Sequence, residues 1–187
     1  MIHRAAAERL AQARLSPRRL EHSHRVAAQA AAFARRWGAS AAAADLAGLL
    51  HDLWREASSE EILAAAARYG IPVGPIEALR PVGLLHAQVA AAELEEAGLD
   101  GEVTSAIALH TVGGAGMTVL EKCVYLADFC EPGRDPQGLE EIRHLEQSSL
   151  DEAVAAAARR TLLDLIGRGR PVVPAALGLY NESHVSD

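Results

Sequence analysis

Two adjacent titratable residues, His51 and Asp52, interrupt an apolar stretch of the chain that reads GLLHDLW. Both side chains need bonding partners in such a setting, because a buried charge without one costs several kcal/mol. The sequence holds more residues of these two types in mainly apolar surroundings: His22, His86, His110 and Asp128. Imidazole and carboxylate groups without a thiolate suit iron, manganese, zinc or a similar divalent ion. The set is therefore a candidate for metal ligation.

Each of these histidines has a plainer interpretation when it is considered alone. A single histidine on an apolar face is more often a core residue that bonds a backbone carbonyl than a metal ligand. Together the six residues favour a metal site, because all except the adjacent pair come from different helices and can converge inside a bundle. Six ligands exceed the need of one open catalytic ion, so two ions fit better. Neighbouring helical residues point about 100° apart, so His51 can serve one ion while Asp52 bridges to the next.

The chemistry that suits such a centre is hydrolysis of a phosphoanhydride. A water that bridges two cations loses its proton readily and becomes a hydroxide at neutral pH. The cations also neutralise phosphate oxygens as charge shifts in the transition state. No serine or cysteine nucleophile is required, and none stands beside a convincing base.

Three further residues are candidates for binding substrate phosphates. Arg55 follows Asp52 by one helical turn, Thr111 follows His110, and Arg134 lies in a loop after Pro132. Arginine can grip a phosphate with two parallel hydrogen bonds. The alternatives are a solvated helix-end arginine, a hydroxyl bonded to its own backbone and a surface loop arginine, respectively.

Two polar residues near His22 receive other assignments. His24 lies two residues further along the same expected helix, faces a different direction and is interpreted as solvated. Glu21 could orient a metal ligand from outside the coordination shell. A surface carboxylate is the favoured interpretation of Glu21.

Helical periodicity and end signals predict an all-α fold of seven or eight helices in one domain, residues 1–187. The expected helices cover residues 16–38, 40–56, 59–70, 82–98, 100–111, 117–131, 139–147 and 150–169. The segment 71–81 carries three prolines and is expected to be a loop with at most one short turn. The core is expected within about residues 16–170, and the weakly periodic tail from Pro171 is expected to be peripheral.

Composition narrows the class of ligand and the compartment. The chain has 187 residues and a formal net charge of −7, which argues against a nucleic-acid duplex but allows a small phosphorylated ligand beside a metal. The only cysteines, Cys123 and Cys130, fall two turns apart in one expected helix, which favours reduced thiols. Neither a signal peptide nor a membrane-spanning run is evident. A soluble cytoplasmic protein is expected.

Five stretches carry a resemblance to a known family, in order along the chain: RRLEHSHRV, AGLLHDLWRE, GLLHAQVAA, AIALHTVGGAGMTVLEKCVYLAD and EPGR. They span residues 18–134. The chain resembles the HD-domain phosphohydrolase superfamily and, within it, the bacterial YqeK family of symmetrical bis(nucleosyl)-tetraphosphate hydrolases. The adjacent His-Asp pair alone is a weak signal, whereas the HT-x-G, M-x-x-LEK-x-x-YLAD and EP-x-R patterns are specific.

The resemblance implies a helical HD fold, a centre of two divalent transition-metal ions and symmetrical cleavage of diadenosine tetraphosphate to two ADP. Iron is the first expectation for the metal, with manganese or zinc as alternatives. One ion would be held by four residues: His22, His51, Asp52 and Asp128. The second ion would share Asp52 and would also be bound by His86 and His110. The partner would be a nucleotide, with no nucleic-acid polymer and no membrane, and a homodimer is compatible with this picture.

One position departs from the family pattern, and two other functions stay open. Phe129 stands where the family usually has a lysine, which removes a cation near the site. Other HD enzymes, acting on mononucleotides or guanosine alarmones, would share the same ligands. A nucleotide-binding regulatory module without turnover is the alternative from a different class. A purely structural helical protein would leave Asp52 and Asp128 unexplained.

Overall fold

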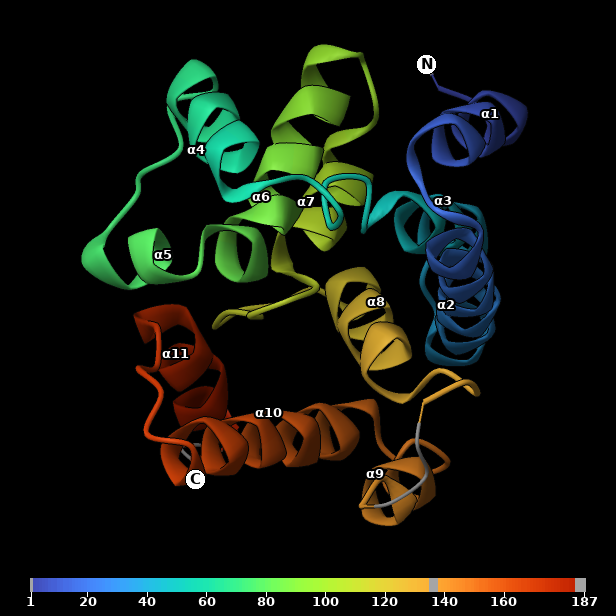
Figure 1. Ribbon diagram of the computed structural model, residues 1–187. Coiled ribbons are helices and arrows are strands. Elements are labelled where there is room, and N and C mark those ends of the chain that lie inside the picture. Colours follow the sequence, from blue (N-terminus) through green and yellow to red (C-terminus); the bar gives the residue numbers. More distant parts are fainter. Residues whose placement is uncertain (1, 135–137, 184–187) are drawn as a thin grey trace.

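A computed structural model describes residues 2–134 and 138–183 of the chain. Within these residues the fold is all helical, as predicted, and contains eleven helices (Figure 1). Their bounds are α1 Arg4–Arg14, α2 Pro17–Trp37, α3 Ala41–Leu50, α4 Ser59–Arg68, α5 Pro75–Leu79, α6 Pro81–Glu96, α7 Gly101–Leu109, α8 Val119–Cys130, α9 Glu140–Leu145, α10 Leu150–Gly167 and α11 Pro174–Glu182. None of these helices combines the length and apolar character that a membrane span requires.

The expected number of helices, seven or eight, is too low for the described residues. The additional helices are short or bury mainly small side chains, so their hydrophobic patterns are weak. The first, α1, is capped by His3 and buries Ala7 and Ala11. The five-residue α5 falls in the segment where one short turn is allowed. The last, α11, starts with Pro174 at its first turn and buries Leu179.

The helix predicted over residues 40–56 ends earlier, at Leu50, so the prediction is wrong beyond that residue. His51 is the C-terminal cap, and its Nδ1 donates to the Gly48 carbonyl oxygen over 2.7 Å. That carbonyl would otherwise accept the amide of Asp52 in a continuing helix. The chain instead continues in turns, in which the Arg55 amide donates to the Asp52 carbonyl oxygen. The His-Asp pair therefore lies at a helix end, where its side chains can diverge.

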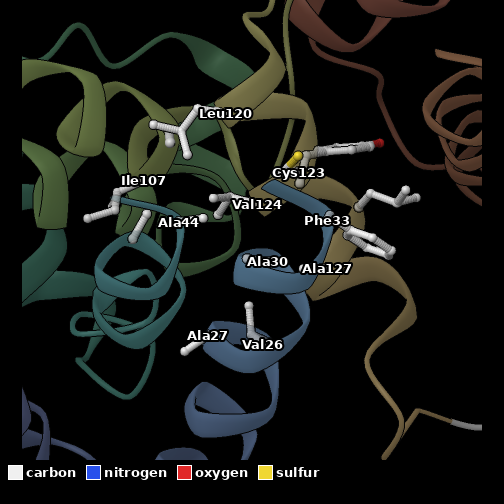
Figure 2. Packing of buried hydrophobic residues seen from close by; sticks show 14 of the residues in the cluster. Val26, Ala27, Ala30, Phe33, Ala44, Ile107, Leu120, Cys123, Val124 and Ala127 are labelled. Carbon is white, nitrogen blue, oxygen red and sulfur yellow. The ribbon is translucent and has the colours of Figure 1, made fainter. Parts of the chain in front are cut away.

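Close packing of α2 on α3 brings His22 near His51. The two helices meet largely through alanines and a glycine, and Figure 2 shows Ala27, Ala30 and Ala44 in this core. A Cβ atom added at Gly48 would lie only 2.6 Å from the Ala27 Cα atom. Small residues thus allow the two backbones to approach, which places the side chains at their ends within reach of each other.

The C-terminal helix packs against the loop that follows His110. A Cβ atom on Gly113, whose φ is +69°, would lie 2.5 Å from Leu179 Cδ2 in α11. The Gly116 amide donates to Glu182 Oε2 over 2.8 Å. The segment after residue 170, for which no helix is predicted, therefore supports the loop between α7 and α8. Residues 184–187 and 135–137 of the expected tail and loop lie outside the described part of the chain.

Candidate metal centre

Each of the four candidate histidines has its Nδ1 atom fixed from outside the centre. His51, His86 and His110 have this atom 2.7 Å from the carbonyl oxygens of Gly48, Val82 and Ile107. A carbonyl oxygen only accepts, so Nδ1 of each of these rings carries the hydrogen. For His22 the acceptor is the Glu131 carboxylate, at 3.2 Å. All four rings can therefore present Nε2 as a ligand atom.

The carboxylate of Asp52 lies between two pairs of histidines. Its Oδ1 atom is 3.2 Å from His86 Nε2 and 3.9 Å from His110 Nε2. Its Oδ2 atom is 3.3 Å from His51 Nε2 and 3.7 Å from His22 Nε2. The two oxygens thus face opposite halves of the centre, which is the arrangement of a bridging ligand.

Asp128, from α8, joins the half of the centre that contains His22 and His51. Its Oδ1 atom lies 3.0 Å from His22 Nε2 and 3.8 Å from His51 Nε2. Its side chain is 21% exposed, whereas that of Asp52 is almost fully buried. Asp128 therefore marks the side from which solvent reaches the centre.

The ring nitrogens have the unmet needs that a cation would satisfy. The Nε2 atoms of His22 and His51 are buried and have no hydrogen-bond partner among the described residues. The Nε2 atoms of His86 and His110 lie 3.2 Å apart, yet both rings hold their hydrogen on Nδ1. The Thr111 hydroxyl lies 3.3 Å and 3.0 Å from these two atoms and has one hydrogen to donate. The hydroxyl hydrogen can therefore satisfy only one of the two Nε2 atoms, and the lone pair of the other has no hydrogen to accept.

Ligand atoms of two groups of residues lie within 4.8 Å of one another. The groups are His22, His51 and Asp128, and His51, Asp52 and His110. Both groups combine imidazole and carboxylate donors, which suits the expected divalent ions. His51 appears in both groups and His86 in neither, although His86 is the histidine nearest to Asp52 Oδ1. The two groups include five of the six candidate ligands and share His51, so the donor set fits a divalent metal.

The electrostatics of the centre favour the metal-binding protonation states of Asp52, Asp128 and His110. The pKa of His51 shifts the other way, because burial would lower it but Asp52 and Asp128 raise it above its ordinary value. Burial would raise the pKa of Asp52, but the charge of His51 and the close approach of the His51 and His86 rings hold it well below its ordinary value. Burial would also raise the pKa of Asp128, but His22, His51 and Arg134 lower it below its ordinary value. Burial and the charges of His51 and His86 lower the pKa of His110 to about 3. Ionised carboxylates and a neutral His110 are the ligand forms.

Two arginines touch the carboxylates of the centre. Arg134 Nη2 lies 2.7 Å from Asp128 Oδ1, so this predicted phosphate contact is paired with a candidate ligand. Arg19 Nη1 lies 2.8 Å from Asp52 Oδ2. The Arg55 side chain forms no hydrogen bond or ion pair with either aspartate in the described structure. Sequence reasoning overlooked Arg19, although it precedes His22 by three residues and so shares its face of α2.

The structure also shows where the other residues considered near the centre lie, namely His24, Glu21 and Phe129. His24 Nε2 is 3.0 Å from Glu8 Oε1 on the surface, away from the other histidines, as expected. Glu21 is exposed, whereas Glu131 is buried against His22. The sequence signal that points to Glu131 is its place as the first residue of the EPGR stretch. Phe129 is half-buried and stacks on Tyr125, with ring centroids 6.4 Å apart.

A helical bundle that gathers histidines and an adjacent His-Asp pair in this order defines a class of phosphohydrolases, the HD proteins. The chain belongs to the HD domain family, whose family model matches residues 19–133 and so includes all six candidate ligands. Close relatives carry a more particular name. Proteins of Bacillus subtilis and Staphylococcus aureus are each 34% identical to this chain and are named symmetrical bis(5'-nucleosyl)-tetraphosphatase. These alignments cover 89% and 97% of this chain and 90% and 94% of the two relatives.

A third relative with the same name, from Halalkalibacterium halodurans, is 31% identical over 97% of both chains. A crystal structure of a Clostridium acetobutylicum protein has a TM-score of 0.89 and 25% identity, covering 98% of this chain and 97% of its own. It is described as a predicted HD superfamily hydrolase involved in NAD metabolism. The likeness therefore extends over nearly the whole chain.

Proposed function

We propose that this protein is a metal-dependent hydrolase that cleaves diadenosine tetraphosphate symmetrically into two ADP. The name shared by three relatives at 31–34% identity supports this substrate. The observation that carries the proposal is the position of Asp52, whose two oxygens face two pairs of histidine Nε2 atoms. A carboxylate in that position suits two ions better than one.

The proposed ligands are the six residues of the centre, with Asp52 shared between two divalent ions. His22, His51 and Asp128 would complete one side, and His86 and His110 the other. Iron is the metal proposed first, with manganese and zinc as alternatives. When bound, the ions would supply a water of lowered pKa and neutralise phosphate oxygens.

The other side chains of the centre have roles that follow from their positions. The backbone carbonyls and Glu131 hold the rings in the tautomer that presents Nε2. Arg19 and Arg134 supply positive charge at the edge of the centre, where a polyphosphate would arrive. Thr111 can donate its hydroxyl hydrogen to a phosphate oxygen if the histidines bind metal. Arg55 is proposed as a phosphate contact from the turn after Asp52.

Three further parts of the proposal concern the setting of the reaction. We place the protein in the cytoplasm, with a small nucleotide as its partner and neither a membrane nor a nucleic-acid polymer. A homodimer is a prediction that light scattering of the purified protein tests. The extent of one HD domain over residues 1–187 also stays a prediction.

The test is product analysis in water labelled with heavy oxygen, with metal content measured on the same protein. Symmetrical cleavage should yield only ADP, and one label should appear in only one of the two ADP molecules formed per turnover. Equal amounts of AMP and ATP would contradict the symmetrical reaction. Turnover of NAD, mononucleotides or an alarmone, with the tetraphosphate untouched, would favour another HD phosphohydrolase. Tight binding without turnover by fully metallated protein would favour a regulatory module.

A further inference from the structure

A buried carboxylate outside the six candidate ligands holds one of them. Glu131 caps the end of α8, and the residue is only 2% exposed. Its Oε2 atom accepts from Arg25 Nε and from the Gly133 amide, each over 2.6 Å. Its Oε1 atom lies 3.2 Å from Nδ1 of His22. The carboxylate is thus fixed on one side and directed at the histidine on the other.

His22 differs from the other three histidines in the origin of its Nδ1 partner. His51, His86 and His110 use carbonyls three or four residues back along the chain. The partner of His22 is a charged group 109 residues away. A carboxylate that accepts from a ligating histidine fixes its tautomer and makes Nε2 a stronger donor than a carbonyl does.

We infer that Glu131 is a positioning residue that holds His22 with its hydrogen on Nδ1, so that Nε2 binds metal in the His22–Asp128 half of the centre. The inference rests on the proposed metal ligands. It assigns Arg25 and the Gly133 amide to holding Glu131 itself. A Cβ atom at Gly133 would lie 2.7 Å from Arg25 Nε, so a side chain at this position would displace the guanidinium that holds Glu131.

The two donors on Oε2 make Glu131→Gln a sharp test. In the variant, the amide oxygen should take the place of Oε2, because both neighbours there are N–H donors. The amide NH₂ group then faces His22 Nδ1, which must become an acceptor. The ring hydrogen moves to Nε2, and that atom can no longer bind metal. The substitution keeps the size of the side chain and changes only which atoms donate.

The experiment titrates purified protein with Zn²⁺ against a competing chelator. Glu131→Gln should weaken zinc binding in one half of the centre about ten- to a hundredfold. Glu21→Gln is the matched control, because it removes an exposed carboxylate next to His22 and should leave zinc affinity unchanged. Nitrogen NMR of the zinc-loaded proteins supplies a readout independent of activity. His22 should be bound through Nε2 in the native protein and unbound in Glu131→Gln.

The outcomes separate this inference from the proposed function. If the native protein binds no zinc, iron or manganese, the metal proposal fails. If the native protein binds metal and Glu131→Gln binds it equally, with His22 still a ligand, only the role of Glu131 is overturned. Should the variant not fold, the native zinc-loaded protein still decides, since a His22 ring with its hydrogen on Nε2 contradicts the inference.

Discussion

An added Cβ atom at Gly48 would lie 2.6 Å from the Ala27 Cα atom, so α3 crosses α2 without room for one methyl group between their backbones. Gly48 is also the residue whose carbonyl accepts from His51. The same position therefore sets the distance between the helices and the orientation of the histidine that ends α3.

Gly48→Ala should destabilise the protein by about 1–3 kcal/mol, because backbone atoms of α2 must shift to admit the methyl group. Displacement of His51 should also lower metal affinity. Chemical denaturation and metal titration measure the two effects. Gly167→Ala is the control, because nothing lies within 4 Å of its added Cβ atom, and it should not lose stability. Equal stabilities for both variants would contradict the close crossing.

Asp52→Ala should remove nearly all metal and all hydrolase activity, because one carboxylate is proposed to serve both ions. His24→Ala removes an imidazole that pairs with Glu8 on the surface and should retain both properties. Metal analysis and a phosphohydrolase assay on the two variants test the ligand assignment. Retention of two metal equivalents by Asp52→Ala would show the bridging assignment to be wrong.

Arg19→Gln should lower kcat/KM for the tetraphosphate about ten- to a hundredfold, the effect of losing one charge-assisted contact of about 1.5–3 kcal/mol. Metal content should not fall, because the arginine pairs with Asp52 and is not a ligand. Arg18→Gln changes an exposed neighbour on the same helix and serves as the control. Steady-state kinetics and metal analysis of both variants decide, and equal kinetics would place Arg19 outside substrate binding.

Cys123 and Cys130 should resist alkylation in the folded protein at pH 8 and react after unfolding. Burial raises the pKa of Cys123 to about 12, from a reference value of 9.0, so its reactive thiolate is about a thousandfold scarcer at this pH. Burial and the neighbouring Glu146 also raise the pKa of Cys130. Mass spectrometry after iodoacetamide treatment, with and without denaturant, measures the protection. Rapid labelling of the native protein would contradict the packing of α8.

The sequence predicts many of the helix starts and ends correctly, because the signals that mark them lie within a few residues of each other. Ser16 and Ser40 cap α2 and α3 as expected, and Gly38 ends α2 with a φ of 80°. The structure explains the glutamate of the LEK pattern, which is Glu121. Thr118 and Glu121 form a capping box at the start of α8. Such contacts span three residues, so spacing alone reveals them.

The features that sequence reasoning missed depend on contacts between distant residues. The bond from His22 to Glu131 joins two helices, and no periodicity within one segment predicts it. The pairing of Arg19 with Asp52 depends on the crossing of α2 and α3. The early end of α3 coincides with a bond from the His51 side chain to the Gly48 carbonyl, which the apolar pattern of the segment does not reveal.

The packing of Leu179 on Gly113 has a consequence for how the protein is made. The six candidate ligands lie between residues 22 and 128, so a nascent chain has them all well before α11 leaves the ribosome. The loop after His110 gains its contacts with α11 only when residues 174–182 have emerged. Domains generally fold as units during synthesis. We expect the ribosome-bound chain to capture metal poorly until α11 docks, so that the centre is completed only some time after all six of its candidate ligands have been made.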